Sequence, residues 1–67
     1  MMLKPGDKVR IAIGLRYGQE ATVIEVIREG KVMVETQDGK HLYYYEDELE
    51  LVKRGKDTDL LAVKIGE

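Results

Sequence analysis

Short segments in which apolar and polar residues alternate follow one another along this chain, and each is bounded by a turn that contains glycine. The clearest segments are residues 8–13 (KVRIAI) and 31–36 (KVMVET), and the turns between segments include residues 29–30 (EG) and 37–39 (QDG). A period of two is typical of a strand with one buried face, and short glycine-containing turns join antiparallel strands. The sequence therefore predicts an all-β fold built from hairpins.

Five strands are expected, together with one polar helical turn over residues 46–48. Five short strands joined by tight turns are typical of a small barrel or sandwich, and closing the sheet would remove its exposed edges. We predict a small SH3-like five-stranded barrel over residues 1–52. Residues 53–67 are expected to be a linker and a short apolar C-terminal tail, an extra strand or a short helix, that packs on the barrel or on a partner. The expected strands are residues 8–13, 21–28, 31–36, 40–45 and 49–52.

The second expected strand, residues 21–28 (ATVIEVIR), carries apolar residues on both faces. Such a strand is either central in its sheet or bent so that it serves two surfaces. Alternation along the expected strands places Val23, Ile27, Met33 and Tyr43 away from the barrel interior. Because exposed apolar patches mark interfaces, we expect the tail, a protein partner or a second copy of the chain to cover them.

The length and composition of the chain bound what it can hold. A chain of 67 residues forms one domain, and a domain of this size has a thin core. With no Cys and a single His, neither a disulfide nor a thiolate metal site is available, and no cofactor is expected. No apolar run is long enough for a membrane span, so we expect a cytoplasmic protein without a membrane partner. The 36% of charged residues and the absence of Asn favour a thermophilic source.

The stretch from residue 6 to residue 26 has a recognisable pattern. It starts with Gly6-Asp7, continues as an alternating strand to Gly14, and reaches an apolar strand after the loop that contains Arg16 and Gly18. This pattern resembles the KOW motif of NusG-type transcription elongation factors and several ribosomal proteins. The resemblance implies an SH3-like barrel that contacts RNA, DNA, the ribosome or RNA polymerase through the loop over residues 14–18.

Two positions depart from that motif, since Gln19 stands where lysine is common and Ala21 where glycine is usual. Two other families are similar in part. Plasmid-type dihydrofolate reductases share the Gly-Asp-x-Val opening, but the segment matching their active site, residues 41–44 (HLYY), lacks the glutamine of that site. Tudor-type barrels bind methylated side chains in an aromatic cage, to which Tyr17, Tyr43 and Tyr45 could contribute.

Two groups of side chains are candidates for binding. The first group places basic residues beside an aromatic ring, a combination that suits single-stranded nucleic acid because cations meet phosphates and rings stack on bases. The second group lies on one side of the fourth expected strand and offers an aromatic face. For both groups the alternative is structural, a solvated strand face or packing against the tail. The first group is Lys8, Arg10, Arg16 and Tyr17, and the second is His41, Tyr43 and Tyr45.

The residue types and the net charge of the chain limit the functions that it can have. The chain contains no Ser or Cys nucleophile, and the carboxylates at 46–50 are too close together to act as an acid–base pair, so no enzyme activity is expected. A net charge of −2 argues against strong nonspecific nucleic-acid binding. We expect a small non-catalytic KOW-like module that contacts RNA, DNA or the transcription or translation machinery. The alternative is a protein-interaction or homo-oligomeric structural module without nucleic-acid binding.

Overall fold

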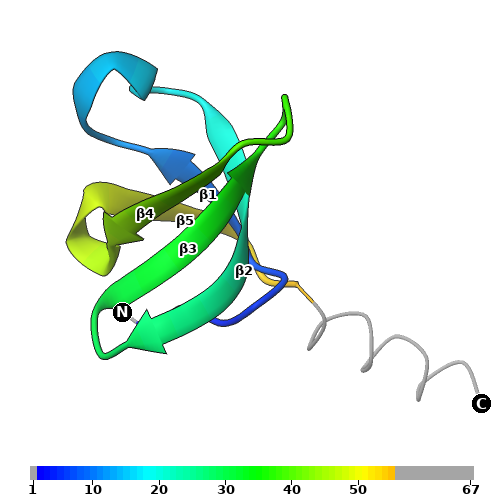
Figure 1. The fold of residues 1–67 in the computed structure, drawn as a ribbon, viewed down its shortest axis with the longest axis vertical. Coiled ribbons are helices and arrows are strands. Elements are labelled where there is room, and N and C mark those ends of the chain that lie inside the picture. The colour runs from blue at the N-terminus through cyan, green and yellow to red at the C-terminus, as the bar shows by residue number, and fades with distance from the viewer. Residues whose placement is uncertain (1, 56–67) are drawn as a thin grey trace, which may run out of the picture.

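A single antiparallel sheet of five strands forms the molecule in a computed structural model that describes residues 2–55 (Figure 1). Two short 3-10 turns interrupt the succession of strands, one after the first strand and one before the last. The prediction of an all-β fold with five strands is confirmed. The elements are β1 (Lys8–Ile11), η1 (Gly14–Arg16), β2 (Glu20–Arg28), β3 (Lys31–Thr36), β4 (His41–Tyr45), η2 (Glu46–Glu48) and β5 (Leu49–Lys53).

The order of strands across the sheet is β4-β3-β2-β1-β5, so the two-faced strand β2 is central, as its sequence indicates. The first four strands pair with their neighbours in the chain, and β5 returns across the sheet to pair with β1. Strands β4 and β5 therefore end the sheet, and the backbone pairing does not close it into a barrel. The loop that carries η1 and the β3–β4 turn extend to the same end of the molecule, away from the β2–β3 turn (Figure 1).

Alternate residues of the central strands build one apolar core. Three half-buried side chains, Leu42, Tyr44 and Leu51, pack against its margin from the two outer strands. Burial of this small set is the main favourable contribution to folding, since each fully buried aliphatic side chain contributes about 1.5–3 kcal/mol. The buried core residues are Leu3, Val9, Ile11, Ala21, Val23, Val32, Val34 and Leu49.

One expected face assignment is wrong. Val23 is only 1% exposed and belongs to the core, where we expected it on the outer side. It pairs with Val34, and the register then shifts so that Glu25, not Ile24, pairs with Met33. An extra residue in one strand is a β-bulge, which reverses the facing of all residues that follow it. Odd-numbered residues of β2 therefore face the core before Ile24, and odd-numbered residues face outward after it.

The first strand is also shorter than its alternation predicts. It ends at Ile11, and Ile13 is 45% exposed at the start of the η1 loop. The amide of Ala12 donates to the Glu48 carbonyl oxygen at 2.9 Å, so the chain leaves the β1–β2 ladder at this point.

The last strand extends one residue into the predicted linker and tail. That segment was expected to begin at residue 53, but Lys53 is the last residue of β5. The apolar part of the predicted tail, residues 58–65, lies outside the described residues.

The carboxylate of Asp7 joins the two ends of the described chain. It is 2% exposed and accepts hydrogen bonds from the backbone amides of Lys4 and Gly55, both at 2.9 Å. The Arg54 guanidinium donates to it at 3.0 Å and also donates to the carbonyl oxygen of Met2 at 2.9 Å. We call Asp7, Arg54 and Gly55 the terminal clasp. The sequence pattern alone indicated no contact between Asp7 and residues 54–55.

Glycine at position 55 is required by this clasp. A Cβ on Gly55 would lie 2.2 Å from the carbonyl oxygen of Gly6, a backbone atom that cannot rotate away. We expect Gly55→Ala to lower the free energy of unfolding by roughly 1–3 kcal/mol, the usual cost of forcing an extra methyl group into a packed site. Denaturant unfolding followed by circular dichroism measures this change. An unchanged midpoint would show that Gly55 is not held against Gly6 in solution.

Candidate functional site

The outer side of strands β3 and β4 presents a surface of aromatic and polar side chains. In the register of this hairpin Lys31 pairs with Tyr45, Met33 with Tyr43, and Glu35 with His41. Alternation sends these six side chains away from the core, because their neighbours Val32 and Val34 point into it. We call this surface the tyrosine face. Its members are Lys31, Met33, Glu35, His41, Tyr43 and Tyr45.

Tyr43 and Tyr45 are the most exposed large apolar groups of the tyrosine face, at 59% and 46%. The ammonium nitrogen of Lys31 lies 5.6 Å from the ring centroid of Tyr43 and 5.8 Å from that of Tyr45. Both distances are within the range of a cation–π attraction. The pair of tyrosine rings therefore already holds a positive charge supplied by the chain itself.

His41 occupies the other end of the tyrosine face. Its Nε2 lies 3.8 Å from a carboxylate oxygen of Glu35, and both side chains are about half exposed. An exposed pair of this kind contributes little to stability. The sequence prediction that His41, Tyr43 and Tyr45 share one exposed side of a strand is confirmed by the exposure of the three side chains.

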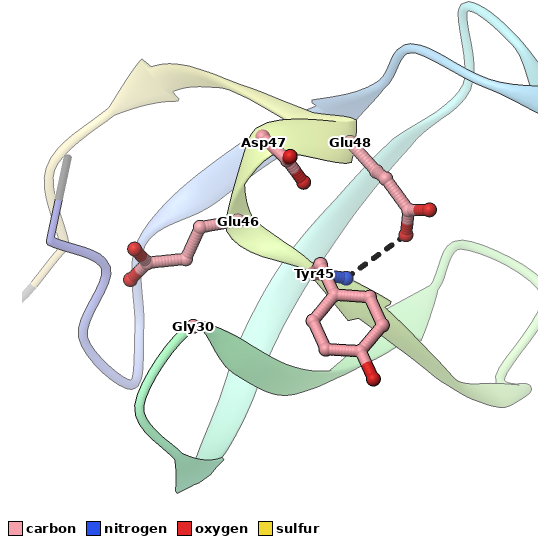
Figure 2. Close-up of a pocket in the computed structure, with 5 residues that line it drawn as sticks. All are labelled: Gly30, Tyr45, Glu46, Asp47 and Glu48. Atoms are coloured by element: carbon pink, nitrogen blue, oxygen red, sulfur yellow. Dashed lines mark hydrogen bonds between the residues drawn. The ribbon is translucent and has the colours of Figure 1, made fainter.

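An acidic hollow borders Tyr45. The hollow has a volume of about 420 Å³ and is lined by Gly30, Tyr45 and the three acidic residues of η2 (Figure 2). The carboxylates of Glu46 and Glu48 point to opposite sides of η2 in this view. Glu48 accepts the backbone amide of Tyr45 at 2.9 Å, and Glu46 accepts the backbone amide of Leu3 at 2.9 Å. Two of the three carboxylates are therefore fixed in position by the backbone.

The basic group predicted from the sequence comes from two elements, β1 and the η1 loop. Lys8 and Arg10 project from the outer side of β1, but Arg10 lies between two carboxylates. Its guanidinium is 3.0 Å from Glu50 and 3.7 Å from Glu20. These exposed pairs neutralise Arg10 locally, so that its charge is largely compensated before any phosphate approaches.

The other two members of that group lie in the η1 loop. Arg16 donates to the side-chain oxygen of Gln19 at 3.1 Å, and Tyr17 is 73% exposed. Leu15 between Gly14 and Arg16 is fully exposed, so this loop presents two large side chains to solvent. Arg16 and Tyr17 thus belong to a loop, whereas Lys8 and Arg10 belong to a strand.

A polar hollow of about 450 Å³ lies between the η1 loop and the β3–β4 turn. Its lining includes Arg16 and Asp38. The hydrogen bond from the Thr36 hydroxyl holds the pKa of the Asp38 carboxyl below its usual value, and the positive charges of Arg16 and Lys40 act in the same direction. The lowered pKa favours the negative charge of Asp38, which faces the positive charge of Arg16 across this hollow.

Sequence reasoning missed two residues of the tyrosine face, Lys31 and Glu35, whereas Met33 was expected on the outer side of its strand. The Asp38-Gly39 turn gives the signal that would have found them, because a hairpin about this turn sets Lys31 opposite Tyr45 and Glu35 opposite His41. Within residues 2–55, the cation–π contacts involve Tyr43 and Tyr45 but not Tyr17, the third tyrosine considered for an aromatic cage.

Among residues 2–55, no group of three or more His, Cys, Asp or Glu side chains is arranged to hold a metal ion. In the same part of the chain, no helix is long and apolar enough to cross a membrane. No protein-family model and no curated protein matches this sequence.

Proposed function

We propose that this chain is a small non-catalytic binding module of SH3-like architecture whose ligand is a protein segment docked on the tyrosine face. The observation that carries this proposal is the pair of exposed rings, Tyr43 and Tyr45, beside Met33 on the outer side of the β3–β4 hairpin. Tyrosine and methionine are enriched in protein interfaces, and tyrosine is frequent among the residues that dominate their energy.

The SH3-like part of the proposal is supported by the strand order and by the 3-10 turn that leads into the last strand. A sheet of this order becomes a barrel when it curls until its outer strands, β4 and β5, approach one another. The stretch that resembles the KOW motif coincides with β1, the η1 loop and β2. Positive φ angles at Gly14 and Gly18 are consistent with the glycines of that motif, since few other residues adopt them.

Charge favours a protein over a nucleic acid as the ligand of the tyrosine face. Arg10 is paired with two carboxylates, and the acidic residues of η2 border Tyr45. A phosphate backbone approaching Tyr45 would meet these negative charges, which repel it. We propose a module without catalytic activity because the chain has no Ser or Cys to act as a nucleophile. Its one histidine, His41, lies exposed beside Glu35.

Nucleic acid is the second candidate ligand, at a different place on the molecule. Arg16 and the exposed ring of Tyr17 are adjacent in the η1 loop, and a cation beside a ring can bind a phosphate while the ring stacks on a base. This candidate is the KOW-type contact with RNA, DNA, the ribosome or RNA polymerase.

Affinity purification with matched variants tests which surface binds. The immobilised chain, Tyr43→Ala and Tyr17→Ala are incubated with nuclease-treated cell extract from the source organism. We expect the wild type and Tyr17→Ala to retain the same proteins, and Tyr43→Ala to lose them with at least about a tenfold drop in affinity, as for an interface tyrosine. Circular dichroism of both variants checks the fold, which exposed positions should tolerate.

The opposite pattern would favour the second candidate. Retention that depends on Tyr17 and disappears after nuclease treatment would contradict docking on the tyrosine face. Binding of single-stranded RNA oligomers at low salt, weakening steeply as salt rises, would then show contact with phosphates.

A further inference from the structure

The free edge of β4 lies directly beside the tyrosine face. In the β3–β4 hairpin the amide of Thr36 donates to the Lys40 carbonyl oxygen at 2.8 Å, and the amide of Glu46 donates to the Gly30 carbonyl oxygen at 2.8 Å. Hydrogen-bonded pairs alternate along an antiparallel ladder, so the even-numbered residues of β4 bond to β3. The backbone groups of the odd-numbered residues of β4 therefore point away from the sheet.

Two backbone amides on this edge, those of His41 and Tyr43, are available to another strand. The amide of Tyr45 donates to the Glu48 carboxylate at 2.9 Å, whereas the amides of His41 and Tyr43 donate no hydrogen bond within residues 2–55. Unpaired groups along an outer strand are a template for another extended chain. A strand added here would place alternate side chains beside the rings of Tyr43 and Tyr45.

The chemistry of those rings indicates which side chain they accept. Tyr43 and Tyr45 already attract the ammonium group of Lys31 at 5.6 and 5.8 Å. The neighbouring carboxylates of Asp47 and Glu48 add negative charge at the end of the strand, and Asp47 is exposed. A cationic side chain from a partner is complementary to both features, whereas an acidic or phosphorylated segment is repelled.

We propose that the ligand of the tyrosine face is an extended protein segment that pairs with the open edge of β4 and places a Lys or Arg side chain on Tyr43 and Tyr45. This inference rests on the proposed function and names the chemistry of its partner. Lys31 opposes such a ligand, because its ammonium occupies the same rings and repels a second positive charge. Lys31 thus lowers the affinity of the tyrosine face for weakly cationic segments.

The test measures binding of a fluorescent extended peptide of alternating Arg and Thr to the full chain by fluorescence anisotropy. We expect Lys31→Met to raise the affinity about two- to fivefold, which corresponds to the usual strength of an exposed cation–π contact. Lys53→Met removes the same charge from β5, away from the tyrosine face, and should change affinity far less. Tyr43→Leu should weaken binding, and a matched Glu–Thr peptide should not bind.

Nuclear magnetic resonance identifies the edge. On addition of the Arg–Thr peptide, the amide signals of His41 and Tyr43 should shift and exchange more slowly, while those of Leu42 and Tyr44 should remain protected throughout. Equal effects of Lys31→Met and Lys53→Met, or equal binding of the two peptides, would overturn the inference. Concentration-dependent pairing of the chain with itself at this edge, without a peptide response, would overturn it as well. If Tyr43-dependent proteins are captured from extract but no cationic peptide binds, the inference fails and the proposed function stands.

Discussion

Ile11→Ala should lower the free energy of unfolding by about 2–5 kcal/mol, the range measured when buried aliphatic residues are truncated to alanine. Ile11 is fully buried in a core to which residues 2–55 contribute eight buried apolar side chains. A chain of this length has a total stability of roughly 3–10 kcal/mol, so the variant should lose a large part of it. Urea unfolding followed by circular dichroism at 25 °C gives the difference directly.

The same chain offers a matched control for this prediction. Ile13 is the same residue type two positions later, but it is 45% exposed in the η1 loop. We expect Ile13→Ala to cost less than about 1 kcal/mol, because its methyl groups already contact water. Similar losses for both variants would contradict the assignment of Ile11 to the core and of Ile13 to the loop.

Asp7→Ala should destabilise the protein by roughly 2–4 kcal/mol, because each buried donor that loses its acceptor costs about 1–3 kcal/mol. The substitution deprives two backbone amides, those of Lys4 and Gly55, of their carboxylate acceptor. It also removes the carboxylate that lies 3.0 Å from the Arg54 guanidinium. The variant should release the end of β5 from the turn that precedes β1.

Two further measurements distinguish this clasp from a general effect of charge. Asp47→Ala removes the same side chain from an exposed position in η2 and should change the free energy of unfolding by less than about 0.5 kcal/mol. Hydrogen exchange in Asp7→Ala should accelerate most at the amide of Gly55, which donates to Asp7. Equal stability of Asp7→Ala and the wild type would contradict the buried clasp.

Much of the fold follows from local sequence. Alternation and turn chemistry predict all five strands, the Glu29-Gly30 and Asp38-Gly39 turns, and the helical turn before β5. They also predict that His41, Tyr43 and Tyr45 share one exposed side. These features depend on residues that are close together in the sequence. The direction of side chains along a strand repeats every two residues, so a short segment is enough to predict it.

The errors lie where distant segments meet. Ile24 is the extra residue of a β-bulge, and no local signal marks the change of phase that buries Val23. Arg10 is paired with Glu50, forty positions later, a contact that its neighbours in the sequence do not indicate. The register between β1 and β5 decides that contact, and the register is set by the whole sheet.

The alternating segments and glycine turns by themselves determined that this chain forms an antiparallel sheet of five strands with an aromatic outer side. The reason is that a strand with one buried face needs apolar residues at every second position, a pattern visible in the sequence. Only the tertiary structure decided that Lys31 lies on Tyr43 and Tyr45, that Asp7 binds Arg54 and Gly55, and that no other strand of residues 2–55 pairs with the outer edge of β4. Each of these contacts joins groups from different elements, so each depends on how the strands pair and not on the composition of any one strand.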